Sequence, residues 1–216
     1  SLEKKYSNVK VILSEENLGN GAGINIGLKK TNTKYAFYID IDTEIQKDTI
    51  RNLLDAAEKT PDFALLAPLV ENYEYKKTDY YQDISSEDSS QRRMNFVPGC
   101  AMFFNIEKIK EIGFFDENIF IYFEPWDLSK RISKAGKKMY VCDKIKFEHL
   151  GGQSHEPKFN YEATLSRNWH YCWSKFYYLR KYSNYINAMR KTLPILIRAL
   201  SKSIKYKFFT LFFYHC

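Results

Sequence analysis

The sequence predicts an α/β protein with a mostly parallel sheet, because short apolar strands alternate with amphipathic helices along its first hundred residues. Residues 35–40 form a nearly continuous apolar run, which is typical of a central strand buried on both faces. Residues 49–59 repeat apolar side chains at helical spacing up to Pro61, and residues 63–67 form the next strand. This alternation favours a parallel sheet flanked by helices.

The other elements follow from similar signals. Before the central strand we predict a strand over 9–14 and a glycine-rich turn over 17–27 that runs into a helix ending near Thr31. The polar segment 71–93 is predicted to be a surface loop, compatible with a short hairpin over 73–81. Beyond it we predict a strand at 100–105, helices at 106–112 and 125–136, strands at 138–141 and 146–148, and a helical region from Ser166 that is interrupted near Pro194.

Composition limits the class of protein. The chain has 216 residues, of which 44% are apolar, so a packed core is expected and global disorder is excluded. It contains no run of about 18 uncharged apolar residues, so no conventional transmembrane helix is predicted. The four cysteines form no C-x-x-C pair, which favours reduced thiols and a cytoplasmic location.

Charge divides the chain into two predicted parts, a domain of residues 1–157 and an extension of residues 158–216. The first part carries 22 basic and 25 acidic residues, a net charge of −3, whereas the second carries 11 basic residues and one acidic residue, a net charge of +10. A basic and aromatic extension suits an anionic surface, either lipid or nucleic acid.

Two aspartates leave the central strand at alternate positions. Asp40 and Asp42 can therefore face one cation, and carboxylate oxygens suit Mg²⁺ or Mn²⁺ held together with a diphosphate. The alternative is a pair of solvated loop carboxylates.

The glycine-rich turn does not have the G-x-G-x-x-G spacing of a dinucleotide site. Gly19, Gly21 and Gly23 would still allow a close backbone approach, and the helix that follows offers free N–H groups to an anion. A tight turn packed on the sheet explains the same glycines.

Glu124 and Asp127 lie three residues apart at the start of a predicted helix. An acidic side chain in aromatic surroundings can act as a general base, but the helix dipole also favours acidic residues at this position. His149, which precedes Gly151 and Gly152, can complete a metal site with the aspartates, or be structural.

Taken in order, these motifs resemble the inverting nucleotide-sugar glycosyltransferases of family 2, which have the GT-A fold, and most closely the rhamnosyltransferase-like members that build bacterial surface polysaccharides. The resemblance covers about residues 6–182. The segments that carry it are 16–27, 38–42, 97–104, 113–117 with 122–128, and 149–154.

The resemblance implies a role for each matching residue. Asp42, Asp40 and His149 would bind a divalent metal, with Asp40 also on the donor ribose. The donor would be lined by Asn17, Gly19, Gly21, Asn25 and Asp40, and the acceptor by Gly99 and Trp126. Asp127 or Glu124 would be the catalytic base, with Asp127 slightly favoured.

The chain departs from the family pattern in two places. Such a domain normally begins with a buried strand and a turn further upstream of Asn17, so we expect an N-terminally truncated chain whose activity is in doubt. Many relatives also carry an acidic residue at the position of Pro125, which cannot act as a base.

The function expected from the resemblance is transfer of a sugar from a nucleoside diphosphate sugar to a glycan or lipid-linked acceptor, with inversion. The alternatives are an inactive fragment with a scaffolding role and a basic nucleic-acid-binding protein. The positive charge lies outside the predicted site and the extension matches no known nucleic-acid module, so no nucleic acid partner is expected. Residues 158–216 are predicted to hold the protein on the inner face of the membrane, although their aromatics can instead pack on the domain.

Overall fold

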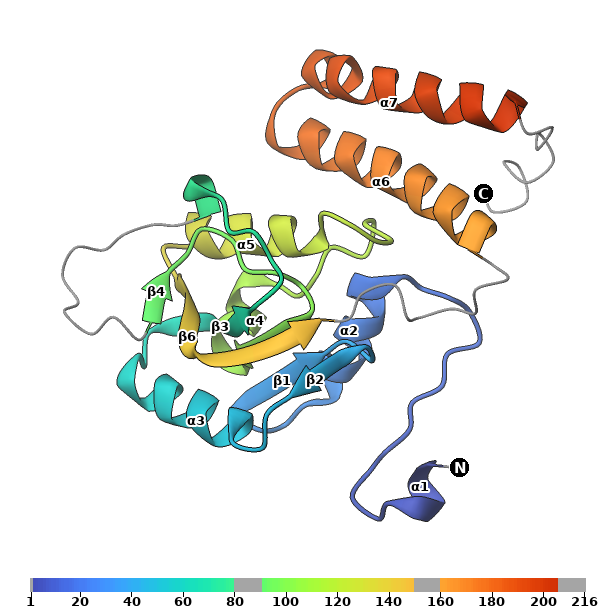
Figure 1. Cartoon of the computed structure of the whole chain (residues 1–216). Helices are drawn as coiled ribbons and strands as arrows, with labels where there is room; N and C mark the ends of the chain where they lie inside the picture. Colours follow the sequence, from blue (N-terminus) through green and yellow to red (C-terminus); the bar gives the residue numbers. More distant parts are fainter. Residues whose placement is uncertain (1, 80–90, 150–159, 206–216) are drawn as a thin grey trace.

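The computed structural model describes residues 2–79, 91–149 and 160–205. Within these ranges the chain forms a sheet with helices on both faces, and a helical pair at the C-terminal end (Figure 1). The predicted α/β class and the C-terminal helices are confirmed. Residues 150–154 of the predicted turn after His149 lie outside the described residues.

The sheet has the order β1-β5-β3-β6-β2, with β4 paired to β6. The strands are β1 (Tyr35–Ile39), β2 (Thr43–Ile45), β3 (Phe63–Val70), β4 (Gln91–Arg93), β5 (Ala101–Asn105) and β6 (Lys138–His149). Among the strand pairs that the described residues form, only β3–β6 is parallel, and the other four are antiparallel. The prediction of a mostly parallel sheet is therefore wrong in this detail. The alternation of helices and strands along the chain does not fix the direction of each strand, and β5 runs against both of its neighbours, β1 and β3.

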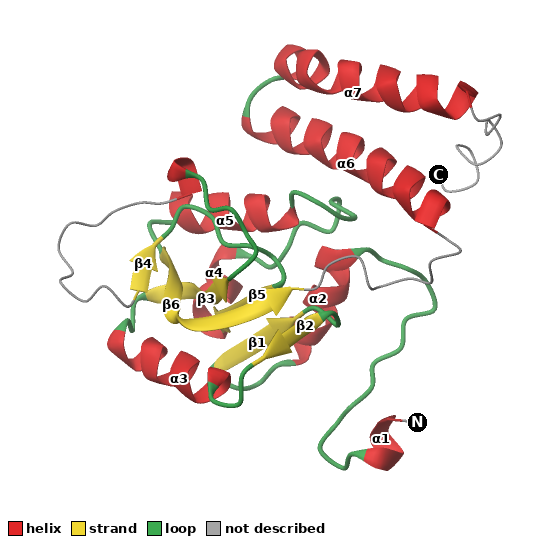
Figure 2. Ribbon diagram, in the orientation of Figure 1, coloured by secondary structure: helices red, strands yellow, loops and turns green. Residues whose placement is uncertain are grey.

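Two groups of helices bury the two faces of the sheet (Figure 2). On one face, α2 (Asn20–Lys30), α4 (Ile106–Ile112) and α5 (Glu124–Lys134) contribute to a core with β3, β5 and β6. On the other face, α3 (Thr49–Lys59) inserts Leu53 and Ala57 against Phe63 and Phe103. The bounds predicted for α3 and α4 are confirmed, because local signals mark both ends of each helix.

The C-terminal helices are α6 (Asn160–Tyr182) and α7 (Tyr185–Lys205). The predicted break near Pro194 is wrong, since Pro194 lies within α7 and the chain turns at residues 183–184. Asn184 places the turn there, because its side chain caps α7 by accepting a hydrogen bond from the Asn187 N–H at 2.8 Å. None of the helices in the described part of the chain combines the length and apolar character that a bilayer crossing needs.

Residues 9–14 form no strand, contrary to the prediction. They follow the short helix α1 (Leu2–Lys5), and their apolar side chains Val9, Val11, Ile12 and Leu13 are exposed. A β-branched sequence becomes a strand only beside a partner, and none of the described strands pairs with this segment.

The structure also differs from two other predictions. The described part of 73–81 holds a short 3₁₀ helix, Lys77–Asp79, and no hairpin. The two strands predicted at 138–141 and 146–148 are one strand, β6, with a register shift against β3 between them. The residues 143–145 that the shift leaves unpaired with β3 account for the gap in the sequence pattern.

Candidate active site

A cavity of about 870 Å³ opens where β1 and β6 end and α5 begins. It is lined by Asn20, Tyr38, Ile39, Asp40, Ile41, Asp42, Tyr73, Phe96, Pro98, Gly99, Cys100, Ile121, Tyr122, Phe123, Glu124, Pro125, Trp126, His149 and Arg167. Segments far apart in the sequence therefore line one cavity, and their side chains include carboxylates, aromatic rings and one arginine.

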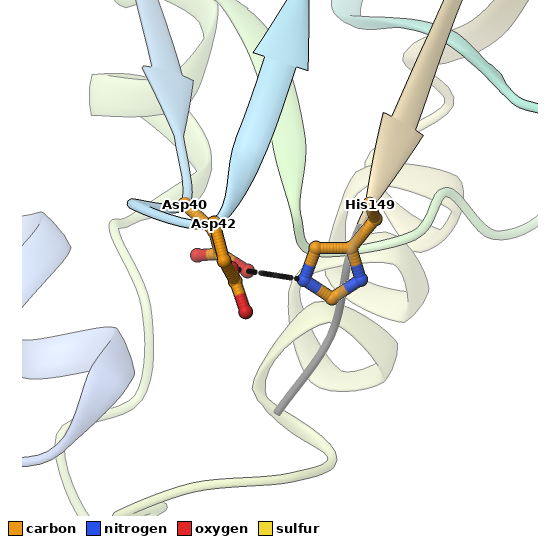
Figure 3. A group of neighbouring side chains, drawn as sticks. All are labelled: Asp40, Asp42 and His149. Atoms are coloured by element: carbon orange, nitrogen blue, oxygen red, sulfur yellow. Dashed lines mark ion pairs between the residues drawn. The ribbon is translucent and has the colours of Figure 1, made fainter. Parts of the chain in front are cut away.

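Asp40, Asp42 and His149 lie together at one end of this cavity (Figure 3). The Nε2 atom of His149 is 3.2 Å from Oδ1 of Asp42 and 3.6 Å from Oδ2 of Asp40. Sheet pairing produces this arrangement, because Thr43 of β2 lies opposite His149 of β6. One ligand atom from each residue lies within 4.8 Å of the others, so the three can hold a metal ion. Two carboxylates and an imidazole suit Mn²⁺ or a similar ion.

Tyr38 and Asn20 connect this metal cluster to Glu124. The Tyr38 hydroxyl donates a short hydrogen bond to Asp40 and lies 3.2 Å from Oδ1 of Asn20. Asn20 in turn donates from Nδ2 to Oε1 of Glu124 at 2.7 Å. Burial, followed by the hydrogen bond to Asp40, raises the pKa of Tyr38, so its hydroxyl remains a donor.

Glu124, the first residue of α5, is 3% exposed but lines the cavity. Its Oε1 atom is held by Asn20, whereas its Oε2 atom has no hydrogen-bond partner among the described residues. Burial raises the pKa of this carboxyl above its ordinary value, only partly offset by the Asn20 hydrogen bond. A buried carboxylate oxygen without a partner is costly, which is the condition expected of a group that meets a substrate.

The two residues before Glu124 have an unusual backbone. Tyr122 and Phe123 have φ angles of 66° and 67°, a region that aromatic residues rarely adopt. Helix α6 compensates for this strain, since Tyr171 packs on both rings at centroid distances of 5.7 and 5.5 Å. Ser174 of α6 also donates to the Ile121 carbonyl at 2.7 Å. Strain of this kind is concentrated at functional sites.

These contacts bear on the alternative left open for the aromatics of residues 166–182. Tyr171, Tyr178 and His170 pack on the loop before α5. This part of the extension therefore packs on the loop that lines the cavity.

Asp127 lies in different surroundings from Glu124. It is fully buried and accepts hydrogen bonds from Arg131 at 2.8 Å, Lys181 at 2.6 Å and Tyr182 at 2.8 Å. Lys181 also reaches Asp116 at 2.6 Å. We call Asp116, Asp127, Arg131 and Lys181 the ion-pair cluster; it joins α5 to α6. Asp127 does not line the cavity and both of its oxygens accept hydrogen bonds, whereas Glu124 lines the cavity.

The residues predicted to bind the donor divide in a similar way. Asn25 is buried and connects α2 to the loop after α4. Its Nδ2 atom donates hydrogen bonds to the Phe115 carbonyl and to Glu117, each at 2.9 Å, and its Oδ1 atom accepts one from the Phe115 N–H at 2.9 Å. Asn17 accepts a hydrogen bond from the Gly19 N–H at 3.1 Å in an exposed turn. Neither side chain lines the cavity.

Two of the three glycines predicted in the turn, Gly19 and Gly21, allow close packing, whereas a Cβ at Gly23 would meet nothing within 4 Å. Gly19 has a φ of 84°, and a Cβ there would lie 2.2 Å from the Phe120 carbonyl oxygen. At Gly21 a Cβ would lie 3.1 Å from Cβ of Phe115 and 3.5 Å from Cβ of Glu124. These glycines bring α2 against the start of α5, which supports the alternative of a tightly packed turn.

Both residues predicted to contact the acceptor line the cavity. A Cβ at Gly99 would lie 2.6 Å from Cγ of Pro125, so this close approach requires glycine. Trp126 is 39% exposed and stacks on Phe96 with a centroid distance of 3.9 Å.

The cavity residues that were not predicted as site residues include three polar ones, Asn20, Tyr38 and Arg167. Tyr38 had a visible signal, since it precedes Asp40 by two positions on a strand and so points to the same side. Asn20 and Arg167 reach the site only through tertiary contacts with residues far away in the sequence.

Comparison with known proteins agrees with this geometry. The model of the family described as "Glycosyl transferase family 2" matches residues 1–115, which is more than half of the 216 residues. No curated protein sequence matches the chain.

Similar solved structures include GalNAc-T7 with UDP, GalNAc and Mn²⁺ (TM-score 0.58, 16% identity, covering 88% of this chain and 37% of that one). The mannosyltransferase PcManGT of Pyrobaculum calidifontis, with GDP-Man and Mn²⁺, has a TM-score of 0.59 and 12% identity over 94% of this chain and 60% of its own. S. aureus TarS residues 1–349, with UDP-GlcNAc, has a TM-score of 0.54 and 13% identity over 90% of this chain and 68% of its own.

At these identities the likeness shows the fold, which is that of GT-A glycosyltransferases, as predicted. The chain spans only 37% and 60% of the first two structures. The match of the family model nevertheless extends over residues 1–115, which include the glycine turn, the two aspartates, β5 and α4. The chain belongs to glycosyl transferase family 2.

Proposed function

We propose that this chain transfers a sugar from a nucleoside diphosphate sugar to a hydroxyl of a glycan or lipid-linked acceptor, with inversion at the anomeric carbon. The observation that carries the proposal is Glu124, whose buried Oε2 has no partner among the described residues and which shares a cavity with the Asp40, Asp42 and His149 cluster. The structural neighbours that contain UDP, GDP-Man or UDP-GlcNAc support a donor of this class.

Asp42 and His149 would hold a divalent cation, Mg²⁺ or Mn²⁺, with Asp40 as a further ligand or as a contact to the donor ribose. Such a cation neutralises the charge that develops on a departing diphosphate. Tyr38 keeps Asp40 in place through its short hydrogen bond. The protein then has to position the donor, exclude water and provide a base.

Glu124 would provide that base. The acceptor oxygen attacks the anomeric carbon from the face opposite the diphosphate while Oε2 of Glu124 takes the hydroxyl proton. The bond between the anomeric carbon and the diphosphate oxygen breaks, and its electron pair leaves with the diphosphate. A single displacement of this kind inverts the anomeric centre. Trp126, stacked on Phe96, would offer a flat apolar surface to the acceptor sugar beside Gly99.

The experiment is a donor screen with the purified chain. UDP, GDP and dTDP sugars are incubated with Mn²⁺, and release of the nucleoside diphosphate is measured with and without glycan acceptors. We expect Mn²⁺-dependent release from one donor class, abolished by chelator. Donor binding without any release would contradict catalysis and favour the inactive scaffold, and absence of donor binding would contradict the proposal altogether.

The place of this reaction would be the inner surface of the cell membrane, in surface polysaccharide synthesis. The supporting observation is that α7 presents an exposed apolar stripe, formed by Ile186, Leu193, Ile197 and Leu200. These residues recur at helical spacing, and the exposed Arg190, Lys191 and Arg198 lie beside them. An amphipathic helix of this kind lies in a lipid interface, and each basic residue adds about 1 kcal/mol on anionic lipid.

Vesicle flotation tests the membrane proposal. We expect the protein to float with anionic vesicles, less so at high salt, and Ile186→Gln with Leu193→Gln and Ile197→Gln to abolish flotation. The matched control is Ile50→Gln with Leu54→Gln, which removes exposed apolar side chains from α3 on the opposite face of the sheet. Equal flotation of the triple variant and the wild-type protein would contradict the membrane role of α7.

A further inference from the structure

A second pocket lies beside the cavity, between α5 and α6. It has a volume of about 400 Å³ and is lined by Asn95, Trp126, Lys130, Ser133, Lys134 and Tyr178. None of these residues except Trp126 lines the main cavity. The function proposed above gives no role to this pocket.

Trp126 is the shared wall of the two hollows. Its ring is fixed by stacking on Phe96 at 3.9 Å with an interplanar angle of 13°, and Phe96 lines the main cavity. Trp126, Lys130 and Lys134 follow one another at four-residue spacing, so they share one face of α5. With a rise of about 1.5 Å per residue, Lys130 and Lys134 lie about 6 and 12 Å along the helix axis from Trp126. A chain of sugars that leaves the main cavity over Trp126 along this face would therefore meet both lysines.

Within the described part of the chain, the charges of these two lysines are not compensated by an acidic side chain. Among the described residues neither Lys130 nor Lys134 forms an ion pair, and their only contact given by the structure is with the ring of Tyr182, at 5.2 and 4.9 Å from its centroid. Neighbouring basic groups are paired, as Lys137 is with Glu111 at 2.8 Å and Lys181 is with Asp116 and Asp127. The nearby carboxylate of Asp127 is already compensated by Arg131 and Lys181. The pocket is therefore positively charged.

We propose that this pocket binds an anionic group, a phosphate or a carboxylate, on the acceptor glycan. This inference rests on the proposed function, because it takes the main cavity as the place where the acceptor hydroxyl reacts. Trp126 and Tyr178 would contact sugar rings, and Lys130 and Lys134 would pair with the charge. Lysine is suited to such a group as a point charge with rotatable donors. The acceptor is thus an acidic glycan or one joined through phosphate, and not a neutral oligosaccharide.

The test compares three probes of similar length: a tetramer of glycerol phosphate, tetragalacturonate and maltotetraose. Binding to the full chain is followed by tryptophan fluorescence and by calorimetry. We expect at least one anionic probe to bind at least tenfold more tightly than maltotetraose, with an advantage that falls as salt is raised. The stronger of the two anionic probes distinguishes phosphate from carboxylate.

The matched variants are Lys130→Met with Lys134→Met, and as control Lys47→Met with Lys59→Met, which removes the same charge from exposed lysines at and beside α3. The first pair should weaken the anionic probe at least tenfold and change maltotetraose binding less than twofold, whereas the control pair should change neither. Equal binding of anionic and neutral probes, absence of binding by both anionic probes, or an unaffected anionic probe in the first pair would overturn the proposal.

Donor turnover by the wild-type protein is measured separately. Loss of selective anion binding with normal donor turnover would overturn only the pocket. Normal anion binding with no donor turnover would overturn only the glycosyltransferase activity.

Discussion

Glu124 and Asp127 lie three residues apart on α5, yet their surroundings are opposite. Glu124 belongs to a group of acidic residues that face a cavity, where its Oε2 lacks a partner in the described part of the chain and burial raises its pKa. Asp127 belongs to the ion-pair cluster, where two cations and a tyrosine occupy its oxygens. One carboxylate is left available at a cost in stability, and the other is used to join two helices.

The comparison shows why acidic residues at a helix start cannot be assigned from their spacing alone. Both carboxylates benefit from the helix dipole, so this effect does not distinguish them. What distinguishes them is the charge that tertiary structure places beside each one. Asp40 increases the negative potential at Glu124, whereas Lys181 and Arg131 neutralise Asp127.

The largest effect is expected at Glu124. Glu124→Gln keeps the size of the side chain and its contact with Asn20 but cannot accept a proton. We expect kcat to fall by about 10²–10⁴-fold with little change in donor affinity, since a positioned base contributes about that factor. Steady-state kinetics with separate titration of the donor measures both quantities. Asp127→Asn is the control, and a larger fall in kcat for that variant would reverse the two assignments.

The metal cluster should show the next largest effect. Asp42→Asn replaces a charged ligand with a neutral amide, so we expect weaker Mn²⁺ binding and a fall in turnover of about 10²-fold, equivalent to about 2.7 kcal/mol of transition-state stabilisation. The concentration of free Mn²⁺ is measured by electron paramagnetic resonance, independently of activity. Asp55→Asn removes an exposed carboxylate from α3 and should alter neither quantity. Normal Mn²⁺ binding by the Asp42 variant would rule out this cluster as the metal site.

The sequence was sufficient wherever the determinant was local. Helices α3 and α4 have the predicted bounds, and Asp40 with Asp42 could be placed on one side because alternate residues of an extended chain point the same way. The strand expected at 9–14 failed because strand formation depends on a neighbour. The different surroundings of Glu124 and Asp127 were not predictable. Lys181 lies 54 residues from Asp127 in the sequence, and Asn20 lies 104 residues from Glu124.

The ion-pair cluster should affect stability more than catalysis. Asp127→Asn leaves Arg131 and Lys181 without their buried partner, and breaking a buried ion pair costs about 3–5 kcal/mol. Lys181 is 30% exposed and can regain water, so the lower end, about 3 kcal/mol, is expected. For a chain of this size the melting temperature should fall by about 6–12 °C. Thermal unfolding followed by circular dichroism measures the change, and an unchanged melting temperature would show that the cluster does not hold α5 to α6.

The smallest effect concerns pH: as the pH falls, the protein should lose its activity before it loses its stability. Burial raises the pKa of Glu124 above the ordinary value of about 4.3, and a base works only when it is deprotonated. Activity should therefore be lost as the pH falls through this raised pKa. Asp116 behaves in the opposite way. Burial alone would raise its pKa, but the hydrogen bonds from Lys181, Asn118 and Tyr177 outweigh burial and lower the pKa to about 2.

Because the pKa of Asp116 is depressed by folding, its contribution to stability is complete above the unfolded value of about 3.9 and is lost as the pH falls from there towards about 2. Between the pKa of Glu124 and about pH 4 the protein should consequently be folded and inactive, and should recover its activity when the pH is raised. The measurement is kcat/KM against pH at saturating Mn²⁺, beside the free energy of unfolding over the same range. The residual activity of Glu124→Gln should lack this acid limb. If that variant keeps the limb, another group is titrating and Glu124 is not the base. If the wild-type protein unfolds together with its loss of activity, the ion-pair cluster does not have the acid resistance that the pKa of Asp116 implies.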